Sequence, residues 1–220
     1  MSYSPNRNYA SLQTIEQGEL VAVSQNKVQY EIIHGWSLES SLKCDTIWKQ
    51  AWLNLFEQIR QAASDETQQN EILSSISTED IHWDWFKKAV ESSTDEYEWF
   101  HLYAESKPQA ACLIYHPEAS ALEPGNIFYV KFVAVAPWNR SCNLRPREFM
   151  RVGETILRAA QRFAVNKLNL RPGFCLHSLP KAEAFYRRLR MVKVDGREDV
   201  QSLAYFELPQ AIALQLMEAN

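Results

Sequence analysis

The apolar residues of the chain follow two spacings, and each spacing predicts one kind of element. Runs rich in β-branched and aromatic residues and bounded by turn residues predict strands. These runs are 19–24, 27–33, 97–104, 109–115, 127–135, 174–177 and 203–208. Segments whose apolar residues recur three and four positions apart predict helices. These segments are 45–63, about 78–90, 151–167, 180–189 and 210–217.

The residues between these segments predict where the elements begin and end. Asp45 is a favourable N-cap, so the first helix is expected to start there. The polar stretch 64–70 predicts a loop or a frayed helix end. Glu79 and Asp80 suit the positive end of a second helix that starts at Ser77 or Thr78.

The run 127–135 is the strongest strand in the sequence. Simple alternation puts four of its residues on one face, namely Phe128, Val130, Phe132 and Ala134. It puts three on the other face, namely Tyr129, Val133 and Val135. Because both faces are apolar, the pattern predicts a central strand of a sheet, which Pro137 ends.

The order of elements predicts an α+β fold. A first hairpin and two helices precede three strands that read as antiparallel, and helix, strand, helix and strand follow. No internal repeat or linker interrupts the order, so one layered domain is the economical interpretation. We expect residues 45–220 to form this domain and residues 1–44, a lead-in with strands, to be part of it.

Composition and charge narrow the range of functions. The net charge is −4 and the pI about 5.8, so a nucleic acid is a poor candidate partner. The sequence contains no run of about 18 apolar residues, so no membrane span is predicted. The four Cys residues are scattered and the first residues lack an apolar signal core, which fits free thiols in the cytoplasm. The five His residues show no metal-ligand spacing, so no metal site is predicted.

Candidate chemistry gathers between the central strand and the next helix. A polar loop leads from the strand to a helix that starts near Arg151. Free N–H groups at a helix start attract anions such as a diphosphate, and Gly153 lets a ligand approach the backbone closely. A single glycine at a helix start also serves packing, and for Gly153 that alternative stays open.

Three motifs in order make the signal more specific. The run from Val135 to Arg140 reads VAPWNR, that from Arg151 to Leu157 reads RVGETIL, and that from Ala182 to Met191 reads AEAFYRRLRM. With these three motifs in this order, the chain resembles the GCN5-related N-acetyltransferase (GNAT) superfamily. The phrases APWNR and LHSLPKAEAFY resemble those of one bacterial branch of that superfamily. The chain departs from the pattern of the superfamily in two places. Residues 141–150 read as an insertion after Arg140. Arg190 stands where a glycine is usual, and an arginine there predicts strain in a left-handed cap.

The resemblance implies a fold, an activity and residue roles. It implies a mostly antiparallel sheet with helices on both faces and a splayed pair of strands. It implies an acyl-CoA-dependent N-acyltransferase that transfers acetyl from acetyl-CoA to a primary amine by direct attack. The cofactor-binding residues that it implies are Val133, Val135, Arg140, Arg151, Val152, Gly153, Glu154, Thr155 and Ser178. Tyr186 is the implied catalytic residue, which protonates the departing CoA thiolate.

Three further residues are candidates for the acceptor side, and each has a structural alternative. Trp85 and Phe86 lie on an early helix and could line a pocket, although core packing explains such residues equally well. His177 ends a strand at the floor of the implied site, although a His there is more often simply hydrogen-bonded. Tyr186 itself could be an ordinary residue of an amphipathic helix.

The expected partners follow from these roles. They are a small-molecule or peptide amine and acetyl-CoA, with no membrane and no nucleic acid, and a homodimer stays open. The main rival is a non-catalytic protein of the same fold that binds acyl-CoA or a protein partner. A pure interaction module, with an exposed apolar patch and no cleft beside Val133, is the third interpretation.

Overall fold

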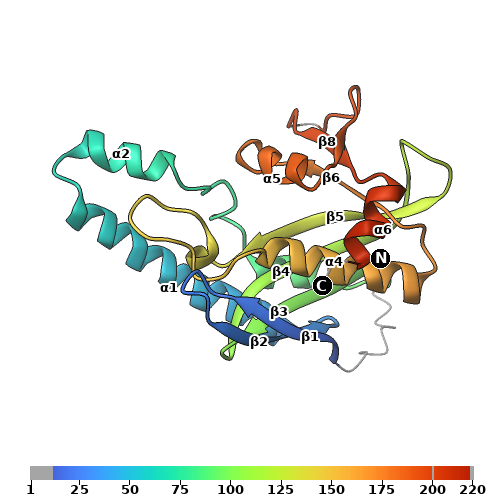
Figure 1. Cartoon of the computed structure of the whole chain (residues 1–220), viewed down its shortest axis with the longest axis horizontal. Coiled ribbons are helices and arrows are strands. Elements are labelled where there is room, and N and C mark those ends of the chain that lie inside the picture. The colour runs from blue at the N-terminus through green and yellow to red at the C-terminus, as the bar shows by residue number, and fades with distance from the viewer. Residues whose placement is uncertain (1–11, 200, 219–220) are drawn as a thin grey trace, which may run out of the picture.

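One sheet organises the computed structural model, which describes residues 12–199 and 201–218 (Figure 1). In these residues eight strands lie in the order β1-β2-β3-β4-β5-β6-β8-β7. All neighbours are antiparallel except β5 and β6, which are parallel. The bounds are β1 Gln13–Val21, β2 Lys27–His34, β3 Tyr97–Ala104, β4 Lys107–Ala119, β5 Asn126–Val135, β6 Phe174–Ser178, β7 Val192–Lys193 and β8 Ala204–Glu207.

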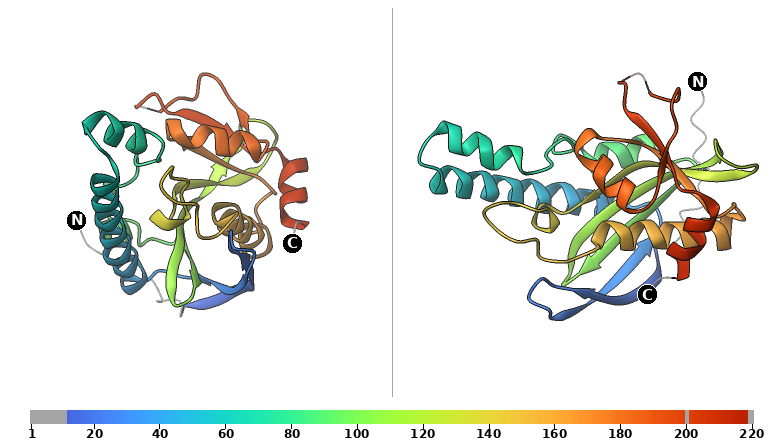
Figure 2. Two further views of the ribbon diagram at one scale, coloured as in Figure 1. Left: turned by 60° about the vertical axis from the view of Figure 1, so that its left-hand side comes forward. Right: turned by 45° about the horizontal axis from the view of Figure 1, so that its top comes forward.

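Helices cover both faces of this sheet, and α1 and α2 lie on the side opposite to α4 and α6 (Figure 2). The bounds are α1 Leu38–Ala62, α2 Glu66–Ser74, α3 Trp85–Glu91, α4 Val152–Leu168, α5 Glu183–Arg188 and α6 Gln210–Glu218. Two short 3-10 turns, Pro137–Asn139 and Pro180–Ala182, follow β5 and precede α5. This is the predicted α+β class, a mostly antiparallel sheet between helices.

The face under α4 holds the largest core. The spacing that predicted this helix gives it a buried stripe that includes Val152, Ile156 and Ala159, all at most 3% exposed. The stripe packs on residues of the central strands such as Cys112 and Phe128. The helix prediction 151–167 is therefore confirmed within one residue at each end.

The opposite face is covered by α1 and α3 through tryptophan rings. The ring of Trp85 meets that of Trp48 at 5.8 Å and that of Trp99 at 6.3 Å, both edge to face. Trp85 is 3% exposed. It is therefore part of the core, and the packing alternative explains it.

Asp45 is not the N-cap of the first helix, contrary to the prediction. The helix starts at Leu38, seven residues earlier in the sequence, and is capped by Ser37, whose hydroxyl accepts the Ser40 N–H at 3.1 Å. Asp45 lies buried inside α1, and its carboxylate accepts the N–H groups of Trp85 at 2.9 Å and Phe86 at 2.8 Å. It thus caps the first turn of a neighbouring helix, which satisfies two amides that α3 cannot satisfy itself.

Two other boundaries were also predicted wrongly, in each case because an Asp cap was overlooked. The segment 64–70 is mostly helical, since α2 starts at Glu66 and Asp65 accepts the Gln68 N–H at 2.9 Å. The next helix starts only at Trp85, where Asp84 accepts the Lys87 N–H at 2.7 Å. Residues 75–84 between them form turns.

A bulge changes the faces of β5. Leu113 of β4 pairs with Phe132, but the next residue, Ile114, pairs with Val130, so Lys131 is an extra residue. A bulge of this kind shifts the alternation of side chains. Phe132 therefore packs with the core under α1, whereas Val133 packs with the core under α4, and the prediction that Phe128, Val130, Phe132 and Ala134 share a face is wrong.

The first hairpin joins the sheet and holds the segment 141–150 in place. Strands β1 and β2 extend the sheet beyond β3. The N–H of Val23 donates to the Glu148 carbonyl and that of Met150 donates to the Val21 carbonyl, both at 3.0 Å. The segment after Arg140 is thus attached to the end of β1. Residues 1–11 of the predicted lead-in lie outside the described residues.

Candidate functional site

Strands β5 and β6 pair over only two residues each and then part. The register contains two pairs, Phe128 with Phe174 and Tyr129 with Cys175. Beyond them β6 pairs with β8 from Cys175 to Ser178, while β5 continues along β4 to Val135. The bulge at Lys131 lies where the strands part, and bulges bend the strand that contains them. The two strands therefore leave a fork, which is the predicted splayed pair.

Backbone groups of β5 face into this fork. The N–H of Ala136 donates to the Gln109 carbonyl at 2.9 Å, across to β4. Because the two sides alternate along an antiparallel strand, the N–H and C=O groups of Val133 and Val135 point away from β4. The carbonyl of Val135 is used by the Arg140 guanidinium, at 2.9 and 3.2 Å. Among the described residues no strand pairs with Val133 on that side.

The start of α4 lies beside the fork and has no side-chain cap. Its N-cap residue, Arg151, is left-handed with φ 59°, and the first backbone bond runs from the Thr155 N–H to the Arg151 carbonyl at 2.9 Å. The N–H groups of Val152, Gly153 and Glu154 therefore lack partners within the helix. Together with the helix dipole they form an anion-attracting site.

Gly153 lies where α4, β5 and α5 meet. A Cβ on this residue would lie 3.6 Å from Cγ1 of Val135 and 3.5 Å from Cζ of Phe185. The helix start and the end of β5 are thus in contact, and larger side chains at position 153 would fill the space between them. The Arg151 guanidinium folds onto the Glu154 carboxylate, with Nε 3.1 Å from Oε2. This pair balances the negative charge of Glu154 at the helix start.

Tyr186 projects from α5 into the core on the α4 side of the sheet. It is 7% exposed, and its ring contacts those of Phe185 at 5.2 Å and Phe206 at 6.3 Å. Burial raises the pKa of its hydroxyl well above the ordinary value, and the nearby Cys112 and Asp80 raise this pKa further. Within the described chain this hydroxyl has no hydrogen-bond partner. It is therefore a protonated donor that is free to serve a ligand.

Two residues predicted to bind the cofactor already have partners. The Arg140 guanidinium binds the Asp80 carboxylate and the Ser77 carbonyl as well as Val135. The Ser178 hydroxyl donates to the carbonyl of Leu179 at 2.9 Å. Arg140 therefore supports the end of β5 from behind, and a phosphate contact would require it to leave Asp80.

The three predicted acceptor-side residues lie apart from one another. Trp85 is buried in the tryptophan core, and Phe86 is exposed on α3. His177 is half-buried on the sheet face opposite to α4, with Nδ1 3.0 Å from the Tyr129 hydroxyl and Nε2 2.7 Å from the Arg197 carbonyl. Only His177 lines a described cavity, which it shares with Tyr129, Tyr205 and Glu118, residues that the sequence did not single out.

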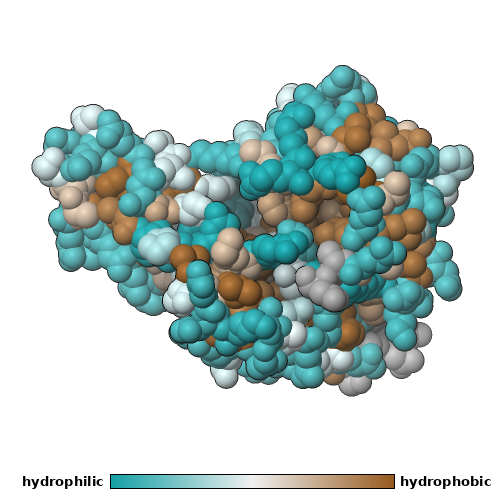
Figure 3. All heavy atoms as spheres, in the orientation of Figure 1, coloured by the Kyte–Doolittle hydropathy of each residue, from teal (hydrophilic) through white to brown (hydrophobic). Residues whose placement is uncertain are grey.

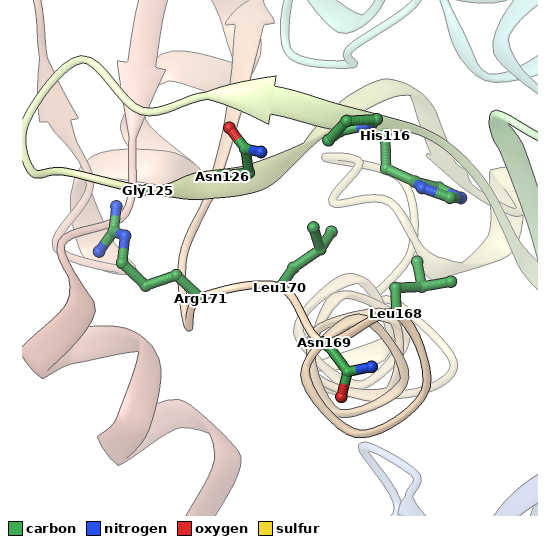
Figure 4. Close-up of a pocket in the computed structure, with 8 residues that line it drawn as sticks. His116, Gly125, Asn126, Leu168, Asn169, Leu170 and Arg171 are labelled. Carbon is green, nitrogen blue, oxygen red and sulfur yellow. The ribbon is translucent and has the colours of Figure 1, made fainter.

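A cavity of about 670 Å³ lies away from the fork (Figure 4). It is bounded by the C-terminal end of α4, with Leu168, Asn169 and Leu170, and by His116 and Asn126 of β4 and β5. A 17-residue helix is about 25 Å long, so this cavity is remote from the start of α4. This cavity is therefore not part of the fork. The space-filling view shows the surface hollowed between α2 and the region of α5 and β8 (Figure 3).

Comparison with known proteins identifies the fold. No protein-family model matches the sequence, and no curated protein matches it. Among solved structures, apo FdhC, a nucleotide-linked-sugar GNAT, aligns with 91% of this chain and 93% of its own at a TM-score of 0.50 and 9% identity. The chain has the GNAT fold. The PaiA N-acetyltransferase from Thermoplasma acidophilum, solved with coenzyme A, aligns with 80% of this chain and 97% of its own at 0.46 and 12% identity.

The GNAT fold that the motifs indicated is thus confirmed. Arg190, which stands in the place of the usual glycine, has φ 65°. The positive φ confirms the expected left-handed cap. None of the helices in the described part of the chain is long and apolar enough to cross a membrane.

Proposed function

We propose that the chain is an acyl-CoA-dependent N-acyltransferase that transfers acetyl from acetyl-CoA to a primary amine. The observation that carries the proposal is the fork between β5 and β6 beside the uncapped start of α4. A long, thin ligand with a diphosphate at one end fits such an arrangement, because its charged end and its arm need different surroundings.

The start of α4 would hold the diphosphate. The N–H groups of Val152, Gly153 and Glu154 point out of the helix and act together with its dipole. Gly153 brings the helix start into contact with Val135 and Phe185, and Arg151 supplies a positive charge at the rim. The site thus needs only one glycine, because Arg151 already provides the left-handed residue before the helix.

The edge of β5 would hold the pantetheine arm. This arm contains two amides, and an extended amide chain can pair with an open strand edge as an added strand does. Val133 offers its N–H and C=O groups on that edge. The thioester would then lie deep in the fork, on the side of the sheet where Tyr186 lies.

The transfer would proceed by direct attack. The amine nitrogen attacks the thioester carbonyl carbon, a C–N bond forms, the C–S bond breaks, and the thiolate takes the proton of the Tyr186 hydroxyl. Burial keeps this hydroxyl protonated at neutral pH, which suits a proton donor. Solvent then returns a proton to the tyrosinate, and the amine loses its extra proton to a base.

The test compares acetyl-CoA with acetyl-pantetheine, which lacks the diphosphate. In calorimetry we expect acetyl-CoA to bind at least 100-fold more tightly, and Gly153→Val to remove most of that difference. A thiol-release assay with a panel of primary amines then tests transfer. No binding of acetyl-CoA at millimolar concentration would contradict the proposal, and binding with no thiol release from any amine would favour the non-catalytic alternative.

A further inference from the structure

A second cavity, of about 420 Å³, opens on the face of the sheet opposite to α4. Side chains alternate along β6, so Phe174 and Leu176 lie in the core under α4 whereas Cys175 and His177 face the other way. Four strands and one loop line the cavity, through Glu118 of β4, Tyr129 of β5, His177 of β6, Tyr205 of β8 and residues 197–199 between β7 and β8.

The cavity adjoins the fork from the side that the proposed acetyl-CoA site leaves free. Tyr129 and Cys175 form the last register pair before the strands part, and His177 lies two residues farther along β6. The tryptophan core under α1 and α3 covers another part of the same face, with Trp99, Leu113 and Ala134 of β3, β4 and β5. Because Tyr129 both lines the cavity and belongs to the last pair before the fork, a ligand in the cavity could reach the fork between β5 and β6 without crossing the sheet.

Tyr129 and His177 form a hydrogen-bonded pair with a defined direction. The Nε2 atom of His177 lies 2.7 Å from the Arg197 carbonyl oxygen, which can only accept, so Nε2 carries a hydrogen. In the neutral ring Nδ1 is then an acceptor, and the Tyr129 hydroxyl, 3.0 Å away, donates to it. The oxygen of Tyr129 keeps its lone pairs for a second donor. The pair is therefore arranged to pass a proton from a ligand through Tyr129 to His177.

The charges that face this pair are mostly negative. Within the described chain the carboxylates of Glu118 and Glu198 have no ion-pair partner. Asp199 accepts the N–H groups of Gln201 and Leu203, both at 2.9 Å, and keeps its charge at the cavity. The one cation of the lining, Arg197, lies over the ring of Tyr205 at 5.6 Å. Among the described residues no group of three or more His, Cys, Asp and Glu side chains is placed to hold a metal ion.

We propose that this cavity binds the acceptor as a cationic amine with a second positive charge, and that Tyr129, with His177 behind it, receives the proton of the attacking nitrogen. The inference rests on the proposed acyltransfer. Three carboxylates against one guanidinium favour a ligand with more than one positive charge. The two phenol rings suit a cation that has given up part of its water.

The proton transfer balances with one proton given to solvent. The ammonium at the reacting end first loses one proton to solvent, which leaves an amine with a lone pair. As the nitrogen–carbon bond forms, the amine nitrogen gives a second proton to the Tyr129 oxygen and the Tyr129 hydroxyl proton moves to Nδ1 of His177. The imidazolium that results is stabilised by the carboxylates of Glu118, Glu198 and Asp199. Tyr129 is thus a catalytic residue, and His177 is a positioning residue that acts through it. The Tyr186 proton goes to the thiolate on the other side of the sheet.

The experiment uses three amines of one length that differ in charge at the far end, namely 1,4-diaminobutane, 4-amino-1-butanol and 4-aminobutanoate. We expect kcat/KM to fall at least fivefold at each step from the dication to the neutral and then to the anionic end. The double change Glu118→Gln, Glu198→Gln should reduce this range to less than threefold, while Glu71→Gln on the remote α2 should leave it unchanged. A flat or reversed series in the unchanged protein would overturn the proposal.

Variants of the proton pair test the second half. Tyr129→Phe should lower kcat at least tenfold with the KM for the diamine within threefold. His177→Gln, which cannot titrate, should lower kcat and remove the acid limb of the pH profile. A His177→Gln profile that keeps its acid limb would mean that His177 only supports the loop, and would overturn the proton path.

A binding measurement separates this inference from the proposed function. Thermal shifts with the three amines, without acetyl-CoA, should show stabilisation by the diamine only, and its loss in the Glu118→Gln, Glu198→Gln protein. Acetyl-CoA binding with no charge preference among amines would overturn the inference alone. Diamine binding with no acetyl-CoA binding would support the cation site and contradict the acyltransfer. No stabilisation by the diamine and no charge preference in turnover would overturn the cation site.

Discussion

Arg140 binds Asp80 through two hydrogen bonds, of 2.5 Å from Nη1 and 2.7 Å from Nη2. The side chains are 10% and 8% exposed, so the pair is almost removed from water. The same guanidinium donates to the carbonyls of Val135, at the end of β5, and Ser77, at 2.8 Å. The pair therefore attaches the open end of the fork to the turns between α2 and α3.

Removing one partner of this pair should strongly destabilise the fold. Asp80→Ala leaves the Arg140 guanidinium buried without its counter-charge, which we expect to cost about 3–5 kcal/mol of the free energy of unfolding. Urea unfolding of the variant against the unchanged protein measures this cost, with Glu71→Gln on the surface of α2 as the control.

The double variant Asp80→Leu, Arg140→Met distinguishes a charge effect from a loss of shape. Apolar side chains of similar size leave no unpaired charge, so the double variant should be more stable than Asp80→Ala. If the double variant loses as much stability as the two single changes together, the ion pair is not the reason for the loss.

Arg151 and Glu154 should act on acetyl-CoA affinity in opposite directions. Glu154→Gln removes a negative charge from the helix start and frees the Arg151 guanidinium, so the dissociation constant should fall about three- to tenfold. Arg151→Gln leaves the negative charge of Glu154 without its counter-charge and should raise the dissociation constant by a similar factor. Because Arg151 is 59% exposed, both effects should shrink as salt is added.

Calorimetry at two salt concentrations measures this pair of variants. The control is Arg187→Gln, because Arg187 forms the same kind of pair with Glu183 on α5, at 3.2 Å, with its side chain 56% exposed. Changes of the same sign in Glu154→Gln and Arg151→Gln would contradict a diphosphate at the start of α4.

Tyr186→Phe should lower turnover and leave the affinity for acetyl-CoA nearly unchanged. A proton donor to the leaving group contributes roughly 100-fold or more to the rate, and the missing hydroxyl has no hydrogen bond within the described chain whose loss would disturb the fold. A thiol-release assay measures turnover and calorimetry measures affinity. Tyr115→Phe, on β4, is the matched control, and equal turnover in Tyr186→Phe would exclude this residue from the reaction.

The elements of the proposed cofactor side could be predicted because their residues lie in short, local patterns. The helical spacing of Val152, Ile156 and Ala159 set the start of α4, and the FY pair in α5 placed Tyr186. In such segments one helix or one strand end brings the residues together. Their positions then depend mainly on local periodicity, which the sequence shows directly.

The residues around the second cavity could not be predicted in the same way, because they meet only through the order of the strands. Glu118 and Tyr205 are 87 positions apart, and they approach because β8 lies between β6 and β7 in the sheet. Likewise Asp45 caps a helix 40 residues away, and no local pattern marks the bulge at Lys131. These features arise from tertiary packing.

The buried His101 should make the protein less stable as the pH falls below about 6.5. It lies on β3, 0% exposed, and both ring nitrogens lack a hydrogen-bond partner among the described residues. Burial lowers the pKa of its imidazole to about 4 from an ordinary value of 6.5. The unfolded chain therefore takes up a proton at a pH where the folded protein does not.

The sign of the effect follows from this difference in proton uptake. Stability rises with pH wherever the unfolded state binds more protons, so the contribution of His101 is complete above pH 6.5 and is lost between about 6.5 and 4. The difference between the two pKa values corresponds to about 3 kcal/mol. Below pH 4 both states are protonated at this residue, and no further loss comes from it.

Urea unfolding at several pH values, with His101→Leu and the unchanged protein side by side, measures this contribution. Carboxylates that titrate in the same range affect both proteins equally, so they cancel in the difference between the two curves. Between pH 7.5 and pH 4, the free energy of unfolding of the variant should rise by about 2–3 kcal/mol relative to that of the unchanged protein. His82→Leu, at an exposed position, should follow the unchanged protein. A His101→Leu curve parallel to both would show that the pKa of His101 is the same in the folded and unfolded states.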